Sequence, residues 1–105
     1  MAVNSKAGTD GMRADSVVRR LLHSGDGYTA ALMHGAPSAG AAPHSHMQAQ
    51  FIYILRGGGT LQNGTEQCAL KAGQAAAIAP DTPHTFIRLD EETDWLEFFV
   101  PERHF

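Results

Sequence analysis

Two histidines, His44 and His46, stand one residue apart just before a run of strand-forming residues. Alternate side chains of an extended strand point to the same face, so the two imidazoles are predicted to project together. Gln50 lies an even number of positions further on and shares that face. Imidazole binds divalent metals well, but two rings make an incomplete site. The pair therefore predicts a metal site that needs another ligand from elsewhere in the chain.

His84 is the predicted third imidazole. It follows the sequence "PDTP" at positions 80–83, a rigid turn that would deliver it at the start of a new strand. Three neutral imidazoles and the amide oxygen of Gln50 would leave coordination positions open for water or substrate. The predicted cofactor is a divalent metal ion, Zn, Ni, Fe or Mn. Surface positions or local hydrogen bonds are expected for the remaining histidines, which are His23, His34 and His104.

Short β-type runs separated by turn signals make up most of the chain, with almost no helical periodicity. This pattern is typical of an all-β sandwich or barrel. The dipeptide Asn63-Gly64 is a hairpin signal, and the glycine run at 57–59 is expected to end the strand that follows the histidine pair. The predicted strands cover residues 16–23, 28–34, 48–55, 60–62, 65–70, 85–89 and 95–100, with a short one between Gly73 and Pro80.

The length of 105 residues suffices for one domain with one core. The formal charge of −3 gives no basic excess to attract nucleic acid or an anionic membrane, and no apolar run approaches the roughly 20 residues of a membrane span. Residues 1–15 lack the apolar region of a secretory signal and are expected to form a disordered arm before a single domain at 16–105. Cytoplasmic location is expected. Cys68, the single cysteine, excludes an internal disulfide and is predicted to be a small core residue.

The predicted strand at 48–55 is apolar on both faces. One face can line the interior, and the other has to be covered by a second sheet or a second subunit. A chain this short has little material to spare for such a cover. The sequence therefore predicts a homodimer.

The histidine motifs resemble those of the cupin superfamily. Its first motif is a His-x-His pair, three or four residues, a carboxylate, six residues and a glycine, which matches His44, His46, Gln50 and Gly57. Its second motif is a glycine, a proline-rich turn and a histidine, which matches Gly73, the turn at 79–83 and His84. The resemblance extends from about residue 28 to residue 100. It implies an all-β, single-domain jelly-roll β-barrel with a metal held by His44, His46, Gln50 and His84.

Three positions depart from the cupin pattern. Ser38 stands in place of a usual glycine, Arg88 in place of a frequent asparagine, and Gln50 in place of the usual glutamate. A neutral Gln50 leaves a divalent ion with no anionic protein ligand, so such a centre should attract an anionic oxygen ligand. The alternative is that Gln50 is a degenerate ligand in a site that has lost activity.

The last predicted strand contributes three further candidates. Glu97 and Phe99 share one strand face, and Arg103 follows Pro101. A carboxylate and a guanidinium beside a metal suit a general acid or base and a carboxylate clamp. Spacing alone slightly favours the other interpretation, in which the glutamate faces solvent, the phenylalanine is a core residue and the arginine is a terminal surface residue.

The chain combines a His-x-His pair, three residues and a glutamine with a C-terminal acid-x-Phe-x-Pro-x-Arg sequence. This pattern is similar to that of the pectin-degradation cupins of the KdgF type. That family converts 4,5-unsaturated monouronates to the linear ketonised form. The resemblance implies catalytic roles for Glu97, Phe99 and Arg103 and a uronate, a small anionic molecule, as ligand. The acid of that family is an aspartate, so Glu97 is one methylene longer. Two other functions stay open: a non-haem metal dioxygenase of the cupin type, and a non-catalytic cupin that binds a small anion through its metal.

Overall fold

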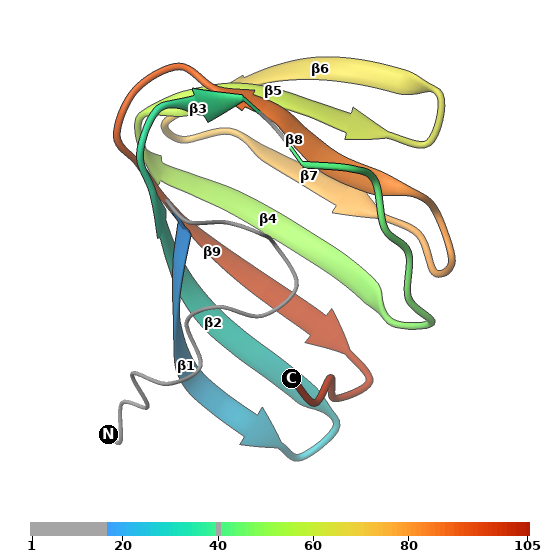
Figure 1. Ribbon diagram of the computed structural model, residues 1–105. Helices are drawn as coiled ribbons and strands as arrows, with labels where there is room; N and C mark the ends of the chain where they lie inside the picture. The colour runs from blue at the N-terminus through green and yellow to red at the C-terminus, as the bar shows by residue number, and fades with distance from the viewer. Residues whose placement is uncertain (1–16, 40) are drawn as a thin grey trace.

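The computed structural model describes residues 17–39 and 41–105, and these residues form β-strands and no helix (Figure 1). No helix in this part of the chain is long and apolar enough to cross a membrane. The predicted arm at 1–15 lies outside the described residues. The strands are β1 (Val17–Gly25), β2 (Tyr28–Gly35), β3 (Ser38–Ala39), β4 (Ala49–Arg56), β5 (Gly58–Asn63), β6 (Glu66–Lys71), β7 (Ala75–Ile78), β8 (His84–Leu89) and β9 (Thr93–Val100).

The strands form two sheets, with antiparallel pairing throughout the described ladders. One sheet has the order β1-β2-β9-β4-β7, and the other has the order β3-β8-β5-β6. The two sheets face each other, and the chain crosses between them repeatedly (Figure 1). This arrangement confirms the predicted all-β jelly roll. Its strands pair as two sheets and do not close into one continuous ladder.

The core lies between the sheets, with Trp95 of β9 at its centre. Trp95 is fully buried, and its ring packs edge-on against Phe86 of the opposite sheet, with 4.9 Å between ring centroids. Along β9 the side chains alternate, so that Thr93, Trp95, Glu97 and Phe99 are buried and the residues between them are less so. The alternation that buries Trp95 in the core therefore also turns Glu97 and Phe99 inward.

The glycine run was expected to end the strand after the histidine pair, and this is confirmed, because β4 ends at Arg56. The next strand was predicted to begin at Thr60, which is two residues too late. Gly58 and Gly59 are the first residues of β5. A Cβ at Gly58 would lie 2.5 Å from the carbonyl oxygen of Leu70, and one at Gly59 would lie 2.3 Å from that of Arg88. Here glycine permits close approach of two neighbouring backbones, because any side chain would collide with them. Gly57 alone has the left-handed conformation of a break, with a φ of 86°.

Two smaller corrections concern turns and loops. In the β5–β6 hairpin, Asn63 pairs with Glu66 in the ladder. The two central residues of the turn are therefore Gly64 and Thr65, and not Asn63 and Gly64 as predicted. The predicted loop after β2 contains the two-residue strand β3, which pairs with the end of β8. Cys68 is half-buried against the core, in agreement with its predicted packing role.

Candidate metal centre

The His-x-His pair lies in the loop before β4 and not in the extended strand conformation that was assumed for its alignment. His44 forms an antiparallel bridge with His84, in which each backbone N–H donates to the other's carbonyl at 3.1 and 2.9 Å. The carbonyl of His46 accepts a hydrogen bond from the N–H of Asp81 at 2.7 Å. This segment is therefore tied to the turn before β8, and the chain bends at Met47 and Gln48 before β4 begins.

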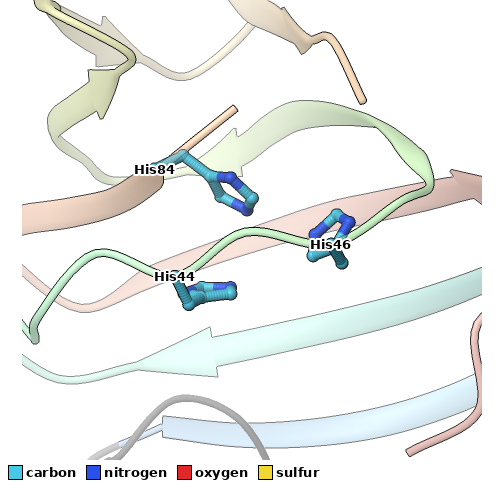
Figure 2. A group of neighbouring side chains, drawn as sticks. All are labelled: His44, His46 and His84. Atoms are coloured by element: carbon cyan, nitrogen blue, oxygen red, sulfur yellow. The ribbon is translucent and has the colours of Figure 1, made fainter. Parts of the chain in front are cut away.

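The bridge brings the three imidazoles together although two of them precede the predicted strand. Figure 2 shows the three rings near one another, two on the loop before β4 and one at the start of β8. One ligand nitrogen from each of His44, His46 and His84 can be chosen so that all lie within 4.8 Å of one another. The His44 and His84 ring centroids are 4.5 Å apart, and those of His46 and His84 are 4.9 Å apart. The predicted triad is thus able to surround a single ion.

Backbone carbonyls orient two of the rings for coordination. Nδ1 of His84 donates to the carbonyl of Thr82 at 2.8 Å, and Nδ1 of His46 donates to the carbonyl of Gln48 at 3.0 Å. With the proton on Nδ1, the lone pair of each ring is on Nε2. Nε2 of His84 is buried and has no hydrogen-bond partner among the described residues. A buried lone pair without a partner is costly, and a metal ion would satisfy it, so these residues fit a divalent metal.

Gln50, the second residue of β4, completes the predicted set of metal-binding side chains. Its Oε1 lies 2.9 Å from Nε2 of His46, and the side chain is buried in the wall of the same cavity. When Nδ1 of His46 carries the proton, these two atoms turn lone pairs toward each other, and a shared cation removes their repulsion. Three imidazoles and one amide would then bind the ion without any negative protein charge.

The environment keeps these imidazoles neutral. Burial, then the neighbouring His84 and His46 rings, lower the pKa of His44 from 6.5 to about 4, with smaller contributions from Arg103 and Arg19. Burial also lowers the pKa of His46 and of His84, and the positive charge of Arg103 acts in the same direction on both. Because only neutral imidazole binds a metal, the triad stays competent for coordination at mildly acidic pH.

The other histidines have different surroundings. Nε2 of His23 hydrogen-bonds the carbonyl of Gly25, and His104 is exposed, as expected. His34 lies on the outer face of β2, with Nδ1 2.6 Å from a carboxylate oxygen of Asp94 and Nε2 2.8 Å from one of Glu92. The hydrogen bond to Asp94 is the main cause that raises the pKa of His34. Its partners are distant in sequence, which the expectation of local bonds did not anticipate.

We expect the free energy of unfolding of the metal-free protein to fall as the pH is lowered from 7 to 5. In the unfolded chain the triad histidines take up protons near 6.5, whereas His44 in the folded chain stays neutral until about pH 4. The unfolded state therefore binds more protons in this window and gains stability relative to the folded state. Thermal unfolding of the metal-free protein at pH 7, 6 and 5 measures the effect.

Two variants separate this contribution from that of His34. His44→Gln should flatten the decline, because it removes the group with the lowered pKa. His34→Gln should steepen it, since a raised pKa contributes stability that is present below pH 6.5 and is lost only as the pH rises through the folded-state value. Equal slopes for the wild type and His44→Gln would contradict the assignment.

A cavity of about 400 Å³, its open mouth included, adjoins the triad. All seven predicted site residues line it, which are His44, His46, Gln50, His84, Glu97, Phe99 and Arg103. Their roles stay predictions. The solvent-facing alternative for Glu97 is wrong, because Glu97 is buried and its Oε2 accepts a hydrogen bond from Nε1 of Trp95 at 2.8 Å.

The segment after β9 forms one wall of this cavity. The backbone N–H of Arg103 donates to Oγ1 of Thr29 at 2.9 Å, and Nε2 of Gln48 donates to the carbonyl of Glu102 at 3.0 Å. The Phe99 ring lies 5.5 Å from the His46 ring, and the guanidinium carbon of Arg103 lies 5.5 Å from the centroid of Phe99. Phe99 thus contacts both a ring of the triad and the guanidinium of Arg103.

The cavity wall also contains Arg19 and Phe105, which were not among the predicted site residues. Arg19 projects inward from β1 and is buried, with its guanidinium carbon 3.6 Å from the centroid of the Phe105 ring. The alternation of side chains along β1 could have indicated an inward-facing Arg19, since Val17, Arg19 and Leu21 share a strand face. No spacing rule marks Phe105 as a wall residue.

The family model for the cupin domain matches residues 31–99, which is more than half of the chain and includes the whole histidine triad. The chain is a cupin. No curated protein sequence matches it significantly. The resemblance inferred from the His-x-His and Gly–Pro–His motifs is therefore confirmed at the level of the superfamily.

Solved structures agree with this assignment. KdgF from Halomonas sp. superposes with a TM-score of 0.78 at 19% identity, over 91% of this chain and 94% of that one. A cupin-2 domain from Rhodospirillum rubrum gives 0.79 at 25% identity, over 98% and 72% of the two chains. The polyketide cyclase RemF from Streptomyces resistomycificus gives 0.74 at 22% identity, over 98% and 80%. At 19% and 22% identity, a likeness shows the fold alone.

Proposed function

We propose that this cupin is a metal-dependent enzyme that opens and ketonises 4,5-unsaturated uronates. The ion, Zn, Ni, Fe or Mn, would be held by the side chains of His44, His46, Gln50 and His84. Glu97, Phe99 and Arg103 would act on the sugar acid. The structural likeness to KdgF is compatible with this proposal and, at 19% identity, does not decide the substrate.

The observation that carries the proposal is the buried carboxylate of Glu97 in the same cavity as three neutral imidazoles. Glu97 is fixed through Oε2 by the indole N–H of Trp95, and it shares the cavity with the guanidinium of Arg103. A fixed acid–base group, a cation and a metal-binding triad around one small cavity suit proton transfer to an anionic substrate.

The reaction is an isomerisation. In the substrate, C5 carries the carboxylate and the ring oxygen, and it is joined to C4 by a double bond. Ring opening breaks the bond between C1 and the ring oxygen, and C1 becomes an aldehyde as its hydroxyl loses a proton. The oxygen left on C5 is that of an enolate, and a proton added at C4 converts the enolate to a ketone. One proton has moved from the C1 hydroxyl to C4, without oxidation.

Three residues of the cavity have a defined part in this scheme. Arg103 binds the substrate carboxylate through charge-assisted hydrogen bonds, and Phe99 forms the wall against which the sugar packs. Glu97, directly or through a bound water, delivers the proton to C4. The chemistry that a divalent ion supplies here is Lewis acidity toward the anionic oxygen of the enolate.

Zinc separates this proposal from its rivals, because zinc has no redox chemistry. The zinc-loaded protein should remove the ultraviolet absorbance of the conjugated enol ether of 4,5-unsaturated galacturonate, and treatment with a chelator should abolish that activity. A dioxygenase would instead require iron and consume oxygen. A protein that binds the uronate and returns it unaltered would be a non-catalytic binding module, and the proposed reaction would be wrong.

We also propose that two copies pair through the outer face of the five-stranded sheet. Phe51 and Tyr53 of β4 are 43% and 37% exposed, and across the ladder they stand beside Phe98 and Leu96 of β9. These side chains point away from the core, since Ile52 between them is buried. A contiguous apolar face of this kind is rarely left in water.

The wild-type protein is therefore expected to be a dimer at micromolar concentration, measured by light scattering. Phe51→Asp should yield a monomer with an unchanged metal content, because the new charge would be buried at the interface and lies on the face opposite to Gln50. A monomeric wild-type protein would remove this part of the account.

A further inference from the structure

Phe105 is the most exposed of the residues that line the cavity. It is 42% exposed, whereas Arg19, Glu97 and Phe99 are at most 5% exposed. The two histidines of the loop and Arg103 are half-buried, and the other lining residues are buried. Phe105 therefore lies at the mouth of the cavity, between the solvent and the buried wall.

Three side-chain contacts hold the Phe105 ring in this position. The guanidinium carbon of Arg19 lies 3.6 Å from the ring centroid, and that of Arg103 lies 5.1 Å from it. The ring also packs edge-on against Phe99, with 5.6 Å between the two centroids. Because Arg19 and Phe99 are themselves buried, the Phe105 ring rests on closely packed neighbours. Phe105 is thus a fixed apolar wall at the mouth.

Hydrogen bonds anchor the backbone just before this ring. Oγ1 of Thr29, a fully buried residue of β2, accepts from the N–H of Arg103 at 2.9 Å and donates to the carbonyl of the same residue at 3.2 Å. Nε2 of Gln48 donates to the carbonyl of Glu102 at 3.0 Å. The segment is therefore tied to β2 and to the loop before β4. Moving Phe105 aside would cost its ring contacts or disturb this anchored segment.

The proposed reaction requires a free hydroxyl at C1, because the ring opens as that hydroxyl loses its proton. In an unsaturated oligouronate, C1 of the unsaturated unit is bonded to the next sugar through a glycosidic oxygen, so its ring cannot open in this way. Such an oligomer would occupy the site without reacting. A site for this reaction is therefore most effective when it excludes a second sugar ring.

We propose that Phe105 is a specificity-determining residue that limits the ligand to a single sugar ring. The second ring of a longer uronate would have to leave the cavity at its mouth, where it meets Phe105. Admitting that ring would break the contacts of Phe105 with Arg19 and Phe99. The loss of one cation–π contact and one aromatic pair corresponds to a decrease in affinity of about tenfold to a hundredfold. The inference rests on the proposed function for the class of ligand, a sugar acid.

Galacturonate and digalacturonate are suitable probes, since they differ by one sugar ring and neither has the C4–C5 double bond of the reacting substrate. Calorimetric titration of the zinc-loaded wild type should show tighter binding of galacturonate by about tenfold to a hundredfold. Phe105→Ala should bring the two affinities within about threefold of each other, because the contacts that oppose the second ring are then absent. The zinc content is measured after each titration, so that removal of the ion by the acid is not mistaken for binding.

Two variants are controls for the change in size. Phe105→Trp keeps an aromatic ring at the mouth and should keep the preference for galacturonate. His104→Ala removes an exposed ring from the neighbouring position and should keep it as well. If Phe105 only packed against its neighbours, Phe105→Ala would lower both affinities equally and leave their ratio unchanged. Phe105→Leu, with a smaller apolar side chain, should reduce the preference and replaces Phe105→Ala if that variant fails to fold.

Equal affinity of the wild type for the two acids would overturn the inference, and so would an unchanged preference in folded Phe105→Ala. A wild type that binds neither acid would overturn it together with the sugar-acid ligand of the proposed function. A failure of the proposed reaction alone would leave the size limit standing, because binding of these two acids does not depend on turnover.

Discussion

Replacing His46 and His84 together with alanine is expected to reduce bound metal from one ion per chain to background. The two rings supply the two nitrogens whose orientation is fixed by backbone carbonyls, Nε2 of His46 and Nε2 of His84. Without them only His44 and Gln50 remain, which is too few donors for a stable site. His46→Ala alone should already abolish stoichiometric binding. Metal analysis after equilibration with zinc and gel filtration gives the result.

The fold should survive the loss of the metal ligands. His46 lies in a loop at the cavity mouth and contributes nothing to the packed cluster around Trp95. His104→Ala is the matched control, since it removes an exposed imidazole outside the triad and should keep the full metal content. Circular dichroism distinguishes loss of the site from loss of the fold. Full occupancy in a folded double variant would mean that the ion is bound elsewhere.

Glu97→Gln is expected to lower kcat for the unsaturated uronate by about a hundredfold to ten-thousandfold, the usual contribution of a positioned proton donor. The amide has nearly the same shape and keeps an oxygen for the indole N–H of Trp95, so the cavity should be preserved. It has no proton of suitable acidity to deliver to C4. KM should change little, because the substrate carboxylate is bound by Arg103. Initial rates of absorbance loss at saturating substrate measure the effect.

Two further variants serve as controls for this prediction. Glu66→Gln makes the same chemical change at an exposed position of β6 and should leave kcat unaltered. Glu97→Asp shortens the side chain by one methylene to the acid of the KdgF-type cupins, and it should retain far more activity than Glu97→Gln. A Glu97→Gln variant that turns over within about threefold of the wild type would remove Glu97 from the mechanism, since that loss is far below what a proton donor contributes.

The metal triad could be predicted from sequence for a reason other than the one first given. Strand alternation was expected to align His44 and His46, yet both lie in a loop. Their convergence depends on the antiparallel bridge between His44 and His84, a contact between segments far apart in the chain. Residue type and spacing identified the three histidines that lie together, whereas the backbone pairing that assembles them is a tertiary property.

The burial of Arg19 could not be predicted from the sequence of β1 alone. In β1, Val17, Arg19 and Leu21 face inward, and Val18 and Arg20 face outward. Each face thus carries apolar residues and one arginine, so alternation cannot tell which face is buried. Pairing with β2 decides it, because Met33 beside Arg19 is buried. Gly58 and Gly59 were missed for a related reason, since their need for glycine comes from the neighbouring strands β6 and β8.

The most direct test of the account is proton NMR of the zinc-loaded protein with 4,5-unsaturated galacturonate in D2O, under nitrogen. The olefinic H4 signal should disappear at a rate proportional to the protein concentration, and the linear keto acid should appear with one solvent deuteron at C4. A substrate that is unchanged after prolonged incubation, or consumed only when oxygen is admitted, would contradict it.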